Sequence, residues 1–142
     1  APMQDYKQFG FVTNLVARQL ERRMAEALRP LDLTPAYLPV IISLSRHQPK
    51  TQAELATTLD IRQPTMAQTL GRMERDGLIT RTPDGRDRRA TSITLTDKTM
   101  GLIGQIQDLA SDIIDKALED LSPERRTQLI NDLNTVSRSL AQ

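Results

Sequence analysis

Apolar residues recur at helical spacing near the start of the chain. Between residues 9 and 28 they fall three or four positions apart, which is typical of one face of an amphipathic helix. This face comprises Phe9, Val12, Leu15, Val16, Leu20, Met24, Ala27 and Leu28. Pro30 ends the pattern, because proline lacks an amide hydrogen and clashes with the preceding helical turn. The pattern therefore predicts an N-terminal helix that is apolar along its full length.

Two shorter helices are predicted before residue 61. Thr34 is a helix cap, and Pro35 follows it at the first helical position. The strongly apolar run over 37–44 predicts a mostly buried helix. Thr51 and Glu54 have the spacing of a capping box, in which each side chain binds a free backbone amide at a helix start. The sequence Leu-Asp-Ile at 59–61 is then the turn to the next helix.

That next helix is predicted from about Gln63 to Asp76. Gly77 follows it, and glycine suits the left-handed position after a helix. The buried stripe is Met66, Leu70 and Met73, and the polar side chains that project elsewhere are Gln63, Thr65, Gln68, Thr69 and Arg72. Two short helices joined by a tight turn, the second with a polar face, form a helix–turn–helix.

A β-hairpin is predicted next. Residues 78–82 and 89–95 are rich in β-branched side chains, and Asp84-Gly85 between them is a turn signal, although the loop is longer than two residues. Three arginines, Arg86, Arg88 and Arg89, lie beside Asp84 and Asp87 in this loop.

The remainder of the chain is predicted to be helical. Thr96 is expected to cap one long helix whose apolar positions run to Leu121. Ser122-Pro123-Glu124 begins the last helix, with an apolar stripe over 129–140.

These elements predict a mainly α fold with a small β-hairpin, in a single domain of 142 residues. Its terminal parts, 1–33 and 97–142, are apolar helices that one small chain has limited volume to bury. Burial against a second copy predicts an isologous homodimer; the alternative is a bundle within one chain. Residues 34–96 form the lobe that holds the helix–turn–helix and the hairpin.

Composition and the absence of known motifs exclude several classes of function. With no cysteine, one histidine, and neither an HExxH motif, a phosphate-binding glycine loop nor a nucleophile elbow, the sequence predicts no enzyme, no metal site and no cofactor. No apolar run approaches membrane-spanning length and no signal-peptide pattern opens the chain, so we expect a cytoplasmic protein without a membrane partner. Residues 46–96 carry 9 basic and 6 acidic side chains, whereas 97–142 carry 5 and 8.

The local basic excess and the two motifs together fit double-stranded DNA. The second helix of such a motif enters the major groove, where glutamine pairs with adenine, threonine approaches the thymine methyl group and arginine reads guanine or holds a phosphate. Arginines at a hairpin tip suit a narrow minor groove. The alternative is that these polar side chains face water, with Arg86 and Arg88 merely solvating a turn.

Several segments together resemble the MarR family of winged-helix transcriptional regulators. They are LATTLDI, QPTMAQTL and RMERDGLI, then Arg81, then Asp87-Arg88-Arg89, and finally ITLT at 93–96. The family pattern is a helix–turn–helix, LE-x-x-GLI-x-R, a D-x-R wing and LT-x-x-G. This chain departs from it at Arg62, where a small capping residue is common, at Met73, and at Thr99, where glycine is common.

The resemblance implies a homodimeric winged-helix protein that binds a palindromic operator, and a repressor that a small aromatic or phenolic ligand releases. It places Arg89 in the minor groove, with Asp87 orienting it or locking the wing through Arg81. Alternatively, Arg81 faces a ligand pocket, which Tyr37 and His47 would also line; otherwise Tyr37 is a core residue and His47 a surface residue. A protein-interaction module without DNA binding is the alternative function.

Overall fold

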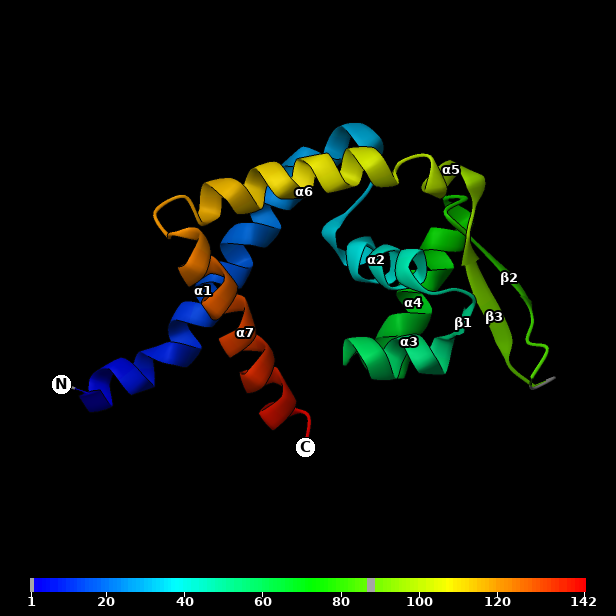
Figure 1. Ribbon diagram of the computed structural model, residues 1–142. Coiled ribbons are helices and arrows are strands. Elements are labelled where there is room, and N and C mark those ends of the chain that lie inside the picture. The colour runs from blue at the N-terminus through cyan, green and yellow to red at the C-terminus, as the bar shows by residue number, and fades with distance from the viewer. Residues whose placement is uncertain (1, 87–88) are drawn as a thin grey trace. The chain divides into compact units, whose positions relative to one another are not determined.

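The computed structural model describes residues 2–86 and 89–142 and is mainly helical (Figure 1). Its longer helices are α1 (Pro2–Leu28), α2 (Leu38–Arg46), α3 (Gln52–Leu59), α4 (Gln63–Arg75), α6 (Ile103–Ala117) and α7 (Pro123–Leu140). The short helical segments are η1 (Arg29–Leu31), η2 (Pro35–Tyr37) and α5 (Asp97–Met100). The strands are β1 (Lys50–Thr51), β2 (Ile79–Pro83) and β3 (Thr91–Leu95). The predicted fold class, mainly α with a small β-hairpin, is confirmed.

The chain divides into two compact units, residues 1–109 and residues 110–142. The functional division that the sequence suggested, with a lobe over 34–96 between terminal helices, stays a prediction. Among the described residues, no helix is both long and apolar enough to cross a membrane.

The small sheet is antiparallel, in the order β1-β3-β2. In the predicted hairpin, Ile79 pairs with Leu95 and Pro83 with Thr91. The third strand, β1, was not predicted because two residues are too short to show an alternating pattern. It sets Lys50 opposite Ile93 and so joins the start of α3 to the hairpin.

The predicted buried stripe of α4 is confirmed, because Met66, Leu70 and Met73 are fully buried. They share one apolar core with Leu44 of α2 and Leu55 of α3. Burying one such side chain contributes about 1.5–3 kcal/mol. Figure 1 shows α2, α3 and α4 gathered beside the strands, so this core fixes the helix–turn–helix against the hairpin.

Both predicted signals at the ends of the helix–turn–helix are confirmed. The Thr51 hydroxyl accepts from the Glu54 amide at 3.2 Å, and Glu54 Oε1 accepts from the Thr51 amide at 3.1 Å, which completes the capping box. Gly77 has a φ of +76°. The Leu78 amide donates to the Met73 carbonyl and the Gly77 amide to that of Glu74. These two bonds form the Schellman arrangement that closes a helix.

The prediction of one long helix after Thr96 is wrong, because α5 ends at Met100 and α6 begins at Ile103. The short α5 is tied to the end of α4: Thr96 Oγ1 donates to the Gly77 carbonyl and Thr99 Oγ1 to that of Leu78, both at 2.7 Å. Gly101, a poor helix former, lies in the turn that follows. Anchoring of the first turn thus interrupts the helix.

The predicted helix start at Thr34 is also corrected. Pro35–Tyr37 form the 3-10 turn η2, and α2 begins only at Leu38. Within the described residues, the Thr34 side chain makes no capping hydrogen bond. The local Thr-Pro signal therefore marked a helical turn rather than the start of the α-helix.

The apolar face of α1 is present but largely uncovered. Phe9 is 48% exposed, and Val12 and Val16 are each 45% exposed, whereas Leu28 at the end of the helix is fully buried. In the second unit, large apolar side chains of α7 are exposed as well, namely Ile130, Leu133 and Leu140.

Candidate nucleic-acid interface

The outer side of α4 carries the predicted base-contacting residues. A helix has about 3.6 residues per turn, which sets Thr65, Gln68 and Arg72 on the side away from the buried Met66 and Leu70. Thr65, Gln68 and Arg72 are exposed. Thr69 lies on the flank of this face and is half-buried. The structure therefore brings these polar side chains together on one helix.

Arg75 lies on the same outer side of α4 and was missed by the sequence reading. It is exposed, and its Nε lies 3.8 Å from Oδ1 of Asp76. The signal was present in the sequence, because Arg75 follows Arg72 by three positions and residues at that spacing are neighbours on a helix surface.

At the start of α4, Gln63 makes a side-chain hydrogen bond, whereas the cap residue Arg62 makes none to the helix in the described residues. Nε2 of Gln52 on α3 donates to Oε1 of Gln63 at 3.0 Å. In the described part of the chain, the Arg62 side chain makes no capping hydrogen bond, and Pro64 occupies the first turn. A link between the two helices of the motif thus stands where a side-chain cap would be expected.

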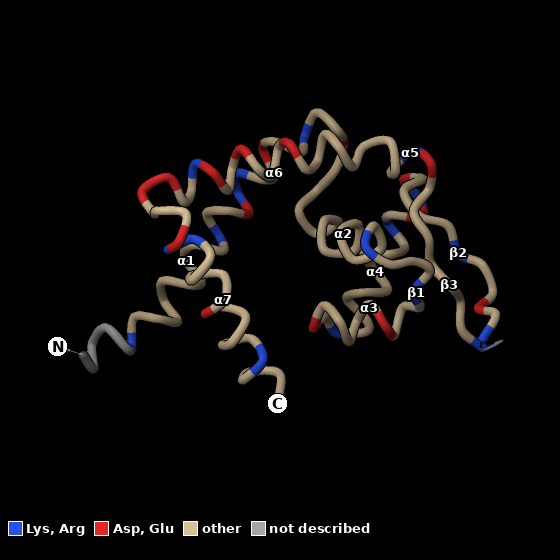
Figure 2. Tube along the Cα trace, viewed as in Figure 1, with Lys and Arg blue, Asp and Glu red and all other residues tan. Residues whose placement is uncertain are grey.

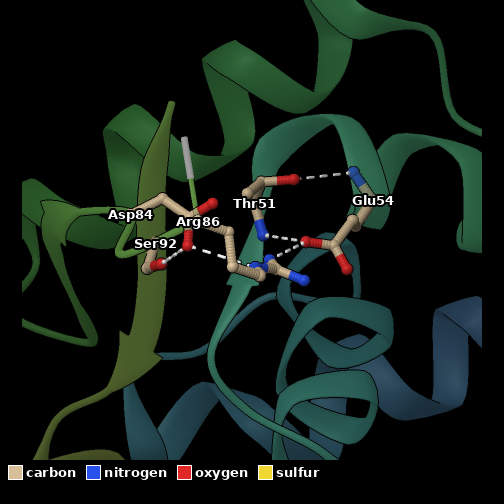
Figure 3. A network of polar contacts seen from close by, with 5 residues as sticks. All are labelled: Thr51, Glu54, Asp84, Arg86 and Ser92. Atoms are coloured by element: carbon tan, nitrogen blue, oxygen red, sulfur yellow. Dashed lines mark hydrogen bonds and ion pairs between the residues drawn. The ribbon is translucent and has the colours of Figure 1, made fainter. Parts of the chain in front are cut away.

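The base of the hairpin loop contains a network of charged and polar side chains (Figure 3). One guanidinium nitrogen of Arg86 lies 2.7 Å from Oε1 of Glu54 on α3, and its Nε lies 3.4 Å from Oδ1 of Asp84. The Ser92 hydroxyl on β3 donates to the same Asp84 oxygen at 3.0 Å. The loop closes where the Asp84 amide donates to the Ala90 carbonyl at 3.0 Å.

These contacts shift the titration of all three charged groups. Hydrogen bonds from the Thr51 amide and then from Arg86 stabilise the Glu54 carboxylate and lower its pKa. Burial would raise the pKa of Asp84, but the hydrogen bonds from Ser92 and Arg86 outweigh it, and the net pKa is lowered. The two carboxylates raise the pKa of Arg86, chiefly through the Glu54 hydrogen bond. The network is therefore fully charged at neutral pH.

The tip of the hairpin is only partly described. Asp87 and Arg88 lie outside the described residues, and Arg89 beyond them is exposed. Figure 2 marks the basic and acidic positions along this hairpin. The predicted roles of Asp87, Arg88 and Arg89 stay predictions.

Arg81 on β2 contacts the end of α4. Its side chain is 25% exposed, and its Nε lies 3.4 Å from Oε1 of Glu74. Neither predicted position of Arg81, against Asp87 or in a ligand pocket, corresponds to this described contact. Because Asp87 is outside the described residues, its pairing with Arg81 stays a prediction.

The other two residues predicted to line a ligand pocket, Tyr37 and His47, lie in different surroundings. Tyr37 is 5% exposed in the core, and its hydroxyl donates to Oδ2 of Asp76 at 2.9 Å. His47, the residue after α2, is exposed. These placements match the alternatives of a core tyrosine and a surface histidine.

A cavity of about 420 Å³ lies instead between α2 and the start of α6. Its lining residues are Ile41, Ile42, Ser45, Arg46, Ile103, Ile106 and Gln107. In the described residues, Tyr37, His47 and Arg81 do not line it. This cavity could not be predicted from the sequence, because its two halves come from distant segments whose isoleucines look like ordinary core positions. The described residues hold no cluster of three or more side chains suited to a metal ion.

Comparison with known proteins relates this chain to one family of transcriptional regulators. The sequence profile of the MarR family matches residues 31–90. The structure of the transcriptional repressor CouR bound to a 23-mer DNA duplex is 28% identical, covers 93% of this chain and 94% of its own, and superposes with a TM-score of 0.84. Wild-type MarR from E. coli, in its apo form, is 25% identical, with 90% and 96% coverage and a TM-score of 0.76.

A third solved structure shares the fold at lower identity. It is a MarR transcriptional regulator from Methanosarcina mazei Go1, 20% identical, with 94% and 96% coverage and a TM-score of 0.88. The helix–turn–helix, the sheet and the surrounding helices of this chain thus recur across these proteins. Residues 31–90 thus match the MarR family of transcriptional regulators, which are not enzymes, and the chain has the fold of solved winged-helix members of that family.

Proposed function

We propose that this protein is a homodimeric regulator that binds an operator in double-stranded DNA. The observation that carries the proposal is the exposed polar face of α4, formed by Thr65, Gln68 and Arg72 on a helix whose other side is fully buried. A rigid helix with a polar outer face is what major-groove reading requires. The DNA-bound structure of the related repressor CouR supports the same assignment.

The contacts divide between α4 and the wing, which is the hairpin of β2 and β3 with the loop that joins them. Gln68 is suited to adenine and Thr65 to the thymine methyl group, while Arg72 is suited to guanine or to a phosphate. Arg75, farther along the same face, is suited to a phosphate. Thr69 flanks this face, and Gln63, at the start of α4, already has Gln52 as a hydrogen-bond partner.

The wing supplies the second contact. We assign Arg89 to the minor groove, whose negative potential attracts a guanidinium without a base-specific hydrogen bond. Asp87 and Arg88, next to it in sequence, belong to the same proposed contact. Arg86 differs from them, because two carboxylates already hold its guanidinium.

The exposed apolar helices support a homodimer. A face with Phe9, Val12 and Val16 nearly half exposed gains stability when a second copy covers it. The exposed Ile130 and Leu133 of α7 suit the same purpose. A two-fold dimer reads a palindromic operator, with half-sites about one duplex turn apart.

The cavity between α2 and α6 supports an effector site. Four isoleucines and the guanidinium of Arg46 suit a small molecule with an apolar ring and an anionic group, such as a phenolic or aromatic acid. A ligand that favours the conformation unable to bind DNA must weaken DNA binding. Repression released by such a ligand completes the proposal, together with the cytoplasmic location expected from the sequence.

A selection of bound genomic fragments, followed by footprinting, tests this function. We expect the enriched fragments to share a palindrome, protected on two half-sites about one turn apart. The absence of any enriched fragment, combined with salt-insensitive retention of a protein partner, would instead assign the winged helix to protein interaction. Protection of a single half-site by a monomer would overturn the dimer.

A further inference from the structure

Arg86 is held between two elements of the fold rather than presented at the tip of the wing. Its guanidinium reaches from the hairpin loop to Glu54 at the start of α3, residues that lie 32 positions apart in the sequence. Figure 3 shows Arg86 between the carboxylates of Glu54 and Asp84. The side chain is 64% exposed, so water reaches it, but Nε and one terminal nitrogen of its guanidinium donate to carboxylate oxygens of the protein.

One oxygen of Glu54 takes part both in the capping box of α3 and in the contact with Arg86. Oε1 of Glu54 accepts from the Thr51 amide at 3.1 Å and from Arg86 at 2.7 Å. The capping box that starts α3 and the tie to the wing therefore share the same oxygen. A capping box holds its glutamate in a fixed position, which makes Glu54 a defined anchor point.

The wing end of the tie is equally fixed. Asp84 is 7% exposed, and Ser92 of β3 holds the carboxylate oxygen that Arg86 approaches. The Asp84 amide also closes the loop to Ala90. Arg86 thus connects the base of the loop to the helix–turn–helix.

We propose that Arg86 is a positioning residue, which fastens the base of the hairpin loop to α3 through Glu54 and so sets where Arg89 lies relative to α4. This inference rests on the proposed DNA binding and deepens it. Loops without such a tie are mobile, and ordering them on binding reduces affinity. With the tie in place, Arg89 and the outer face of α4 are held at one separation before DNA arrives.

Electrostatics alone predicts the opposite effect for Glu54. A carboxylate near DNA repels phosphates, so removing its charge would leave affinity unchanged or raise it. Positioning predicts instead that loss of the Glu54 charge weakens binding, as loss of Arg86 does. Whether loss of the Glu54 charge weakens DNA binding therefore distinguishes a positioning role of Arg86 from a phosphate contact.

Three variants and one control test the proposal. Glu54→Gln keeps an oxygen for the capping box, since glutamine also serves there, but loses the ion pair. Arg86→Gln and the double variant complete a cycle. Asp60→Asn is the matched control: it removes a carboxylate from the exposed turn of the helix–turn–helix, at a φ of 53° that asparagine tolerates.

Anisotropy with a selected operator at several salt concentrations gives the first readout. We expect each single variant to bind about two- to fivefold more weakly, the range that an exposed ion pair supports, and the double variant to be no weaker than either. The salt slope and the Asp60→Asn control should match the wild type. A slope flatter by about one unit in Arg86→Gln, with Glu54→Gln binding normally, would make Arg86 a phosphate contact and overturn the proposal.

Hydrogen exchange in the DNA-free protein gives a readout independent of DNA. The Asp84 amide, bonded to the Ala90 carbonyl, should exchange faster in Glu54→Gln, while the Leu78 amide at the end of α4 should be unchanged. Unchanged exchange at Asp84 would overturn the tie itself. Failure of the wild type to bind any DNA would overturn the proposed function, but would leave this exchange result standing.

Discussion

The Tyr37 hydroxyl donates a 2.9 Å hydrogen bond to Oδ2 of Asp76, across 39 positions of sequence. Tyr37 ends η2, just before α2, and Asp76 is the residue directly after α4. Lys98 of α5 donates to the Asp76 carbonyl at 3.1 Å. The far end of the proposed DNA-reading helix is therefore held by elements that come before and after it in the chain.

Removal of this hydroxyl should destabilise the fold without opening a cavity. Tyr37→Phe keeps the buried ring and loses one hydrogen bond, so we expect the free energy of unfolding to fall by about 1 kcal/mol. Urea denaturation measures it, and Tyr6→Phe makes the same chemical change elsewhere in the chain. Equal unfolding free energies for Tyr37→Phe and the wild type would contradict a contribution from this bond.

Tyr37 should also titrate late. Burial, then the hydrogen bond and the charge of Asp76, raise the pKa of Tyr37 above its ordinary value of 10.0. Because the folded protein favours the neutral phenol, this contribution to stability is complete below pH 10 and is lost as the pH rises through the folded pKa. In Tyr6→Phe, Tyr37 is the one remaining tyrosine. Its tyrosinate absorbance should then appear above pH 10, and an ordinary titration would refute the shift.

Two glycines of the α4 region should respond with opposite signs. Gly77 has a φ of +76°, so Gly77→Ala should destabilise the protein by about 1 kcal/mol through backbone strain. Gly71 lies inside the helix, so Gly71→Ala should stabilise it by about 0.5–1 kcal/mol. Apart from the adjacent residues and, for Gly71, the backbone of its own helix, a Cβ at either position meets no described atom within 4 Å, which removes tertiary clashes from the comparison. Thermal unfolding of the pair measures the difference, and a shared sign would refute the backbone explanation.

Thr99 offers a test of the join between α4 and α5. Its fully buried hydroxyl donates to the Leu78 carbonyl at 2.7 Å. Thr99→Val keeps the shape and should lower the free energy of unfolding by about 1 kcal/mol. Thr80→Val on β2 is the control: its exposed hydroxyl lies 3.0 Å from that of Thr94, where water can replace the contact, so the change should be less than about 0.5 kcal/mol. Equal effects of the two variants would show that the buried Thr99 bond contributes no more than this exposed contact.

Local signals in the sequence predicted local structure well. The Thr51–Glu54 capping box and the turn at Gly77 need only neighbours in the chain, and both are present. The stripe of Met66, Leu70 and Met73 predicted the buried side of α4, which also fixed its exposed side. Much of the candidate interface follows from that one helical pattern.

Features that depend on distant partners could not be predicted. Arg86 looks like another tip arginine until the fold brings Glu54 beside it. The break after α5 depends on hydroxyl contacts of Thr96 and Thr99 with the end of the α4 segment. The hydrogen bond of the Tyr37 hydroxyl likewise depends on Asp76, 39 positions away in the sequence. In each case the contacting atom belongs to a residue too far away in the sequence for a periodic pattern to reveal it.

In the proposed complex, α4 and the wing contact DNA together. Anisotropy with a selected operator should compare the wild type, Arg72→Ala/Arg89→Ala, and Arg29→Ala, which removes an exposed charge outside both elements. We expect the double variant to lose at least about tenfold in affinity, since one good contact contributes about 1–3 kcal/mol, and Arg29→Ala to bind like the wild type. Equal affinity of the double variant and the wild type would contradict the account.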